Sequence, residues 1–194
     1  QLFEETVYKD IAFGPKNMGL GEEEIRERVT KAAEFAGLRP ELLEKSPFEL
    51  SGGQKRRAAI AGVIAMEPKV LILDEPTAGL DPKGRNKILN QIKNYHEQVG
   101  NTILLVSHSM EDVAMFADKV LVMNQAKIFA YDTVENVFAR SEELKSIRLS
   151  VPQITNVFHR LNEEGYPVPR NVYTVAYAKR KLLAELEKEG KLHA

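Results

Sequence analysis

The chain has 194 residues, of which 43% are hydrophobic, and a formal net charge of −1. It is long enough to bury a core in one large domain, or in one domain with an appendage. The near-neutral charge excludes recruitment of nucleic acid or an anionic membrane by the field of the whole molecule. There is no cysteine, which excludes disulfides and thiolate metal sites and fits a reducing compartment.

Two further observations concern targeting and completeness. No apolar run approaches the roughly 18 residues that a membrane span needs, and no signal peptide is visible. The sequence starts with Gln1 rather than Met. We therefore expect a processed or partial chain.

The first fifty residues predict a helical segment. Residues 1–20 carry apolar side chains without clear periodicity. Residues 22–36 have one apolar helical face, glutamates in the first turn and Gly37 as the stop. Residues 40–43 form a short helical turn, and Pro47 ends it.

Gly14 and Gly19 have the spacing of a phosphate-binding loop. The residues that follow are Leu20 and Gly21, where such a loop has Lys and Ser or Thr. The spacing is therefore interpreted as a coincidence.

The stretch Leu50–Gln54 reads Leu-Ser-Gly-Gly-Gln and is followed at once by a helix that ends near Met66, before Pro68. A serine and two glycines at a helix start expose backbone N–H groups at the positive end of the helix dipole, a geometry that binds phosphate. An ordinary serine-capped helix behind a glycine turn explains the same residues. The stretch alone does not decide between the two interpretations.

Two short apolar runs, Val70–Leu73 and Thr102–Val106, flank a predicted helix from Lys83 to Val99 that Gly100 closes. Apolar runs of this length are typical of strands that are buried on both faces of a parallel sheet. Strand, helix and strand therefore predict a βαβ unit with parallel strands.

The remaining third continues with short elements. We expect a helix over 110–116, a third strand over 119–123, and a hairpin at the sheet margin whose second strand spans 128–131. Thr133 caps a short helix that ends at Ala139. After about residue 141 the composition shifts to an appended helical module, with helices over 153–164 and 174–189 that Gly165 and Gly190 end.

Acidic residues and a histidine follow the predicted strands. Asp74 and Glu75 come directly after the first strand, where ligands of open parallel sheets bind. In phosphoryl transfer, such an Asp holds Mg²⁺ and a second acid orients the attacking water. A bare Asp-Glu pair is more often a solvated turn, and His108, just past the next strand, is by itself more often structural. Asp81 before Pro82 caps a helix, reaches across an interface, or does both.

Taken together and in order, these motifs resemble an ABC-type ATPase. Leu50–Gln54 resembles the signature motif, Val70–Pro76 the Walker B strand, Ala78–Asp81 the D-loop, and His108 the H-loop. The resemblance runs from residue 1 to about 140. The head of the chain and the helical tail are similar to ATPases of energy-coupling-factor (ECF, cobalt/vitamin) transporters.

The resemblance implies an α/β fold, a partial P-loop NTPase (RecA-like) parallel sheet with an ABC helical subdomain and a small C-terminal helical extension. The implied domains are residues 1–66, the helical subdomain; residues 67–140, the C-terminal part of the core; and residues 141–194, a helical extension for dimerisation. It also implies ATP and Mg²⁺ as cofactors, and a place on the cytoplasmic face of the membrane.

The resemblance also implies roles for single residues. The nucleotide-binding set consists of Ser51, Gly52, Gly53, Gln54 and Asp81. The first three would cap the γ-phosphate of ATP held by a second ATPase subunit, identical or paralogous, and Asp81 would link the two sites. Asp74 would serve Mg²⁺, Glu75 would polarise the hydrolytic water, and His108 would sense the γ-phosphate. Closure of the dimer would then be passed to a transmembrane coupling protein and a substrate-binding membrane component.

This chain departs from the family by lacking a Walker A loop, which precedes residue 1 in the family. Without the loop's Lys and ring of N–H groups, the main phosphate cradle is lost, so the chain alone is expected to bind ATP poorly and not to hydrolyse it. A smaller departure is Ala126 at the hairpin turn, where the family usually has Gly.

Three functions compete. The first is the ATPase subunit of an importer for vitamins or transition-metal ions. The second is a non-transport ABC protein, which would want a long coiled coil or a basic face, and neither is present; nucleic acid is therefore not an expected partner. The third is a non-catalytic regulatory ABC module.

Overall fold

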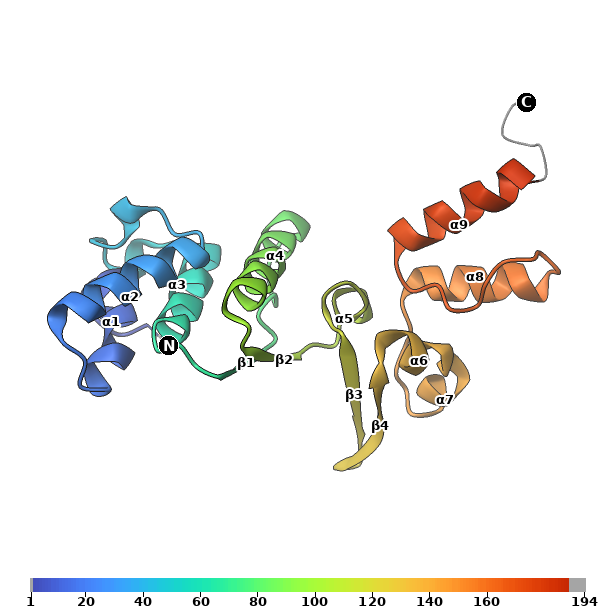
Figure 1. Ribbon diagram of the computed structural model, residues 1–194, viewed down its shortest axis with the longest axis horizontal. Coiled ribbons are helices and arrows are strands. Elements are labelled where there is room, and N and C mark those ends of the chain that lie inside the picture. The colour runs from blue at the N-terminus through green and yellow to red at the C-terminus, as the bar shows by residue number, and fades with distance from the viewer. Residues whose placement is uncertain (1, 189–194) are drawn as a thin grey trace. The chain divides into compact units, whose positions relative to one another are not determined.

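The computed structural model describes residues 2–188, and the chain divides after Val106 into two compact units (Figure 1). The first unit contains, in order, α1 (Val7–Asn17), α2 (Glu22–Phe35), the short 3-10 helices η1 (Pro40–Leu42) and η2 (Pro47–Glu49), α3 (Gly52–Ile64), β1 (Val70–Asp74), α4 (Pro82–Val99) and β2 (Thr102–Val106). The second contains α5 (Met110–Phe116), β3 (Lys119–Asn124), β4 (Lys127–Thr133), α6 (Val134–Ala139), α7 (Ser141–Ser146), α8 (Gln153–Glu163) and α9 (Val175–Lys188). The predicted division at residues 66 and 140 stays a prediction.

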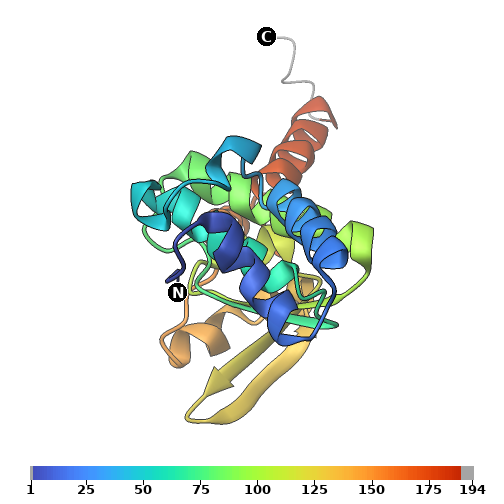
Figure 2. The same cartoon turned by 90° about the vertical axis from the view of Figure 1, so that its left-hand side faces the viewer.

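Helices α1, α2 and α3 pack against one another in the first unit (Figures 1 and 2). Their shared core consists of aliphatic side chains at helical spacing, which are Val7, Ile11, Ile25, Val29, Ala58, Ala61 and Ile64. The helix predicted over 22–36 is confirmed, with Gly37 in the left-handed conformation at φ 64° just after it. Gly14 lies within α1, so the interpretation of its spacing to Gly19 as a coincidence is confirmed.

Helix α1 was not predicted. Thr6 caps its start by accepting a hydrogen bond from the Lys9 N–H at 3.2 Å. The apolar pattern is broken by Asp10, which is buried and accepts hydrogen bonds from the main chain of Phe3 and Glu4. Because this polar residue occupies a position on the buried face of the helix, the apolar periodicity typical of a helix is interrupted in the sequence.

Strands β1 and β2 are parallel neighbours, in a register that pairs Val70 with Thr102 and Asp74 with Val106. The predicted βαβ order is confirmed, and α4 lies over one face of the two strands (Figure 1). The prediction that both faces are buried is wrong. Leu71 is buried, whereas Ile72 on the opposite face is 64% exposed. The described residues of this unit provide a helical layer on only one side of the sheet.

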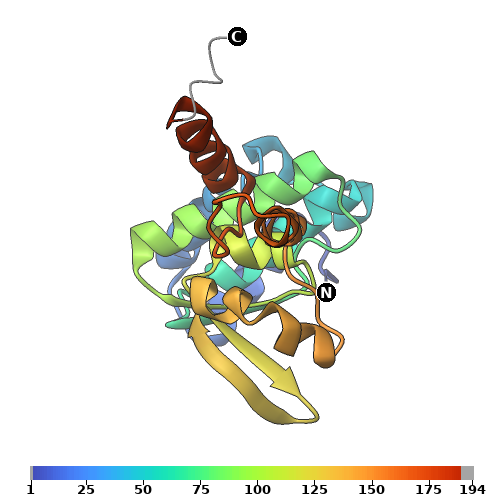
Figure 3. The ribbon, with the colours of Figure 1, turned by 90° about the vertical axis from the view of Figure 1, so that its right-hand side faces the viewer.

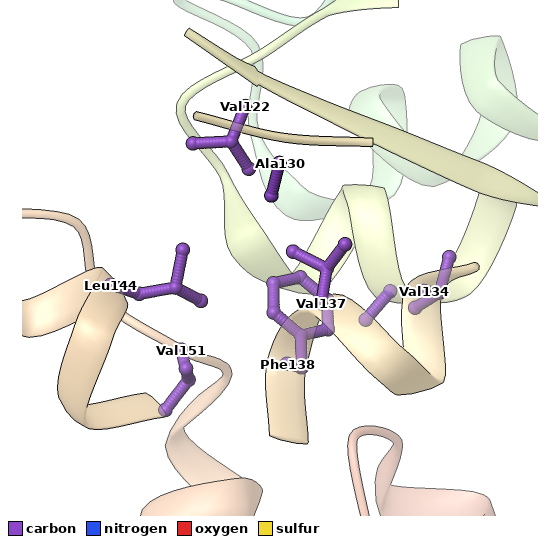
Figure 4. Close-up of a cluster of buried hydrophobic side chains, with 8 residues drawn as sticks. Val122, Ala130, Val134, Val137, Phe138, Leu144 and Val151 are labelled. Carbon is purple, nitrogen blue, oxygen red and sulfur yellow. The ribbon is translucent and has the colours of Figure 1, made fainter. Parts of the chain in front are cut away.

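In the second unit, β3 and β4 pair as an antiparallel hairpin (Figure 3). The hairpin is confirmed, but among the described residues it forms a two-stranded sheet of its own rather than a margin of the β1–β2 sheet. Figure 4 shows the buried cluster to which the hairpin and its neighbouring helices contribute. The cluster consists of Ala114, Val122, Ala130, Val134, Val137, Phe138, Leu144 and Val151.

Helices α8 and α9 form the helical tail, with a small core of Phe158, Val168, Val172 and Ala178. Helix α8 confirms the helix predicted over 153–164, and Pro152 directly precedes it. The predicted end of the last helix at Glu189, with Gly190 as its stop, lies outside the described residues. None of the described helices is both long and apolar enough to cross a bilayer.

Candidate functional site

The Ser51 corner begins α3. The Ser51 hydroxyl accepts a hydrogen bond from the Gln54 N–H at 3.4 Å, and the Ser51 N–H donates to the Gln54 side-chain oxygen at 2.8 Å. This capping box satisfies the N–H groups of Ser51 and Gln54 and leaves those of Gly52 and Gly53 without an intrahelical acceptor. A β-carbon built on Gly52 would meet nothing within 4 Å, so the space beside it is open. The corner is an ordinary serine cap that can also receive an anion.

The acidic pair lies at the carboxyl edge of the two-stranded sheet. Asp74 ends β1 and is exposed, and Glu75 follows it half-buried. The Glu75 N–H donates to the Val106 carbonyl at 2.9 Å, which fastens the pair to the end of β2. Glu75 has a φ of 46°, in the left-handed region that a residue with a β-carbon rarely adopts. The backbone therefore turns sharply where the sheet meets the acidic pair.

The arginine Arg56, which the sequence did not single out, reaches this turn from α3. Its guanidinium donates to the carbonyl of Pro76 at 2.8 Å and to that of Glu75. No sequence pattern could have revealed this contact, because the partners lie 20 and 19 residues along the chain. It brings the helix of the Ser51 corner next to the acidic pair.

The loop that follows the acidic pair ends at α4. Asp81 caps α4 by accepting a hydrogen bond from the Gly84 N–H at 3.1 Å, with Pro82 as the first helical residue. Gly79 has a φ of 74°, which this turn requires. The capping role of Asp81 is confirmed, and its role across an interface stays a prediction.

His108 follows β2 by two residues and lies in the second unit. Its loop is held by the Ser107 hydroxyl, which accepts from the Ser109 N–H at 3.1 Å. Ser109 in turn caps α5 by accepting from the Asp112 N–H. The parallel pairing brings the ends of β1 and β2 to the same sheet edge. A contact of His108 with Glu75 stays a prediction.

The carboxylates at the end of β1 suit Mg²⁺ better than a metal ion whose ligands all come from the protein. Within residues 2–188, no three His, Asp or Glu side chains gather closely enough to hold a metal ion. Magnesium is usually bound through one or two carboxylates, with phosphate oxygens and water as the other ligands. Asp74, exposed at the strand end, fits such a site.

An open pocket of about 400 Å³ lies between α1 and α3. Its lining is mostly apolar and includes Phe3, Phe13, Val63 and Met66. Asp10 also lines it, and one oxygen of this buried carboxylate has no hydrogen-bond partner among the described residues. A group that brings apolar surface and a donor to this pocket would satisfy both features.

The comparisons identify relatives over almost the whole chain. A family model described as ABC transporter matches residues 2–78. The energy-coupling factor transporter ATP-binding protein EcfA2 of Caldanaerobacter subterraneus subsp. tengcongensis is 58% identical, over 96% of this chain and 65% of the relative. The protein of the same description from Clostridioides difficile is 51% identical, over 98% of this chain and 67% of the relative.

Among solved structures, cbiO1 from Clostridium perfringens is described as part of the ABC transporter complex cbiONQ. It superposes with a TM-score of 0.67 at 41% identity, over 84% of this chain and 63% of that chain. The predicted fold class, an α/β partial P-loop NTPase with an ABC helical subdomain, is thereby confirmed. The chain spans about 65% of the length of the first curated relative. At this identity and coverage, the chain belongs to the ABC transporter family, among the energy-coupling factor transporter ATP-binding proteins.

Proposed function

We propose that the protein containing this chain is the ATP-hydrolysing subunit that energises an ECF-type importer of vitamins or transition-metal ions. The observation that carries the proposal is the fold of the first unit. It puts an open, anion-receptive helix start at Ser51 and a carboxylate pair at the carboxyl edge of parallel strands, in a chain of the ABC family. Phosphate-binding N–H groups and metal-binding and base-forming carboxylates are what nucleotide hydrolysis needs.

Each candidate residue has a proposed task. The N–H groups of Gly52 and Gly53, and the Ser51 hydroxyl, bind the γ-phosphate of a nucleotide that a second ATPase subunit holds, and Gln54 orients the corner through its hydrogen bonds with Ser51. Asp74 holds Mg²⁺, which neutralises the phosphate charge when bound.

The remaining residues act on the attacking water, on the γ-phosphate and on the connection between the two nucleotide sites. Glu75 accepts the proton of the attacking water as general base, and His108 donates a hydrogen bond to the γ-phosphate. Asp81 connects the two nucleotide sites across the dimer. The second subunit is an identical chain or a paralogue.

The substitution Glu75→Gln in the full-length protein, assembled in its membrane complex, tests the proposal. Loss of the general base should lower the rate of ATP hydrolysis by at least about 100-fold while ATP binding persists, because the amide keeps the size of the side chain. Glu97→Gln, which removes an exposed carboxylate of α4, is the matched control. Full hydrolysis by the Glu75 variant would refute the assignment.

The pocket between α1 and α3 is the surface that we propose for the transmembrane coupling protein. Its apolar lining and the unpartnered Asp10 oxygen fit a helix that presents apolar side chains and one basic group. Such docking holds the protein at the cytoplasmic face of the membrane. Val63→Asp should then abolish co-purification with membrane components, whereas Lys55→Gln, on the same helix, should not.

Two alternatives predict different partners. A non-transport ABC ATPase would co-purify with nucleic acid or other soluble partners instead of membrane components, and a regulatory ABC module would assemble with the membrane complex without adding hydrolysis. Co-purification combined with ATPase measurements separates the three functions.

A further inference from the structure

We propose that Arg56 is a positioning residue that ties the helix carrying the Ser51 corner to the main chain of Glu75. The proposal rests on the function proposed above, in which Glu75 is the general base. It assigns Arg56 no contact with the nucleotide. It assigns the side chain the task of setting the direction in which the Glu75 carboxylate leaves the backbone.

The contact itself is two-pronged. The Nε–H of Arg56 donates to the Pro76 carbonyl at 2.8 Å, and an Nη2–H donates to the Glu75 carbonyl. The two acceptors are the carbonyls of consecutive residues, so the planar guanidinium holds the two successive peptide units that meet at Pro76. Such a fork cannot be replaced by the single ammonium group of lysine.

Glu75 has a backbone that needs to be held. Its φ of 46° lies in the left-handed region, and a β-carbon-bearing residue persists there only where its surroundings over-determine it. Its N–H donates to the Val106 carbonyl at 2.9 Å, and its carbonyl also accepts from the Ala78 N–H at 3.1 Å. The Arg56 side chain adds a hydrogen bond to this peptide from α3, outside the strand and its turn. The two peptide planes flanking Glu75 determine where its Cα–Cβ bond points.

The other end of the connection is the Ser51 corner. Arg56 lies in α3, little more than one turn after Ser51 caps that helix. A β-carbon built on Gly53 in the first turn would lie 3.9 Å from Leu80, so this turn also packs near the loop after Glu75. A displacement of α3 would therefore carry Arg56 and, with it, the Glu75 peptide. In the proposed dimer, Ser51 serves the partner's nucleotide and Glu75 serves its own, so Arg56 couples the two sites.

The experiment compares Arg56→Gln, Arg56→Lys and the matched control Lys55→Gln in the full-length protein assembled in its transporter complex. Lys55 is the exposed neighbour on α3, and its substitution removes the same charge. Three quantities are measured: kcat for ATP hydrolysis, KM for ATP, and the hydrogen-exchange rate of the Ala78 amide, which reports on the Glu75 carbonyl that it donates to.

Arg56→Gln should lower kcat by at least about tenfold, as expected for a misplaced catalytic group, with KM within about twofold of wild type and an unchanged melting temperature. The Ala78 amide should exchange faster. Arg56→Lys should fall between wild type and Arg56→Gln, and Lys55→Gln should match wild type. Should Arg56→Gln fail to fold, Arg56→Lys carries the comparison.

Equal kcat and equal exchange in the Arg56→Gln and Lys55→Gln variants would overturn the proposal, as would a loss confined to KM. A wild-type complex without ATPase activity would instead contradict the proposed function. The exchange of the Ala78 amide still decides in that case whether Arg56 holds the Glu75 peptide, so the two failures are distinguishable.

Discussion

Tyr95 shows how one buried polar atom affects stability. Its ring is buried in α4 and packs edge-on against Phe35, with ring centroids 5.2 Å apart. Its hydroxyl is buried without a hydrogen-bond partner among the described residues. Burying a hydroxyl without a hydrogen-bond partner carries a desolvation cost, and a phenylalanine at this position would not have that cost.

We therefore expect Tyr95→Phe to leave the free energy of unfolding unchanged or to raise it by up to about 1 kcal/mol. Burial raises the pKa of Tyr95 above its ordinary value. A raised folded-state pKa means that stability is retained below the unfolded pKa of about 10 and lost as the pH rises through the folded pKa. Urea titrations of both proteins at neutral and alkaline pH check this, and a clear destabilisation at neutral pH would contradict it.

Asp132 is an exposed acidic residue whose pKa is also shifted, in this case downward. Its carboxylate accepts hydrogen bonds from the Asn136 side chain at 3.0 Å and the Thr133 N–H at 2.7 Å, and these bonds, the Asn136 bond foremost, lower the pKa of Asp132. The stabilising contribution is therefore present above the unfolded pKa of about 3.9 and lost as the pH falls through the lower folded pKa.

We expect Asn136→Ala to raise the pKa of Asp132 toward its ordinary value, because it removes the largest of the interactions that lower this pKa. Titration of the Asp132 carboxyl carbon by NMR measures the change. Asn90→Ala, which removes an asparagine side chain from α4, should leave the pKa of Asp132 unchanged. An unchanged pKa in the Asn136 variant would contradict the leading part assigned to the Asn136 hydrogen bond.

At the scale of elements, the β3–β4 hairpin contains a strained turn. Gln125 has a φ of 48° and Ala126 a φ of 60°, and a tight turn with two positive φ angles strongly prefers glycine at the second position. The expectation that Ala126 departs from a position suited to glycine is consistent with this angle. The side chain of Ala126 costs about 1 kcal/mol there.

Ala126→Gly should raise the free energy of unfolding by about 1 kcal/mol, because glycine adopts the left-handed region without a β-carbon clash. Denaturant titration with an unchanged m-value measures it. The matched control is Ala184→Gly at an exposed position inside α9, where the same substitution should destabilise by about 1 kcal/mol. Two changes of the same sign would contradict the turn argument.

At the scale of the whole molecule, α9 leaves apolar surface uncovered. Leu183 and Leu186 remain 39% and 40% exposed, although the same helix contributes Ala178 to the core of the tail. A two-fold partner that covers both leucines would gain about 1 kcal/mol for each of the four side chains in the dimer. The tail is therefore the proposed dimerisation extension.

The double substitution Leu183→Asp with Leu186→Asp should weaken dimerisation of the full-length protein by at least about 100-fold. Ala176→Asp, which adds a charge at another exposed position of α9, should have little effect. Analytical ultracentrifugation over a range of concentrations measures both. Unchanged sedimentation of the double variant would remove the tail from the dimer interface.

The sequence by itself determined most of the helices and strands, and the order in which the candidate site residues follow one another along the chain. The strand over Thr102–Val106 and the helix over Met110–Phe116 were predicted with the observed bounds, because apolar periods and terminal signals act over a few residues. The capping roles of Ser51 and Asp81 were predicted from the sequence for the same reason. The family likewise followed from local motifs in their order.

Only the tertiary structure decided which distant groups meet. The burial of Asp10 in α1, the exposure of Ile72 on one sheet face and the grip of Arg56 on the Glu75 peptide depend on packing between segments far apart in the chain. The type of a residue indicates its local conformational preference, whereas the free energy of such contacts depends on which groups the folded chain places next to it.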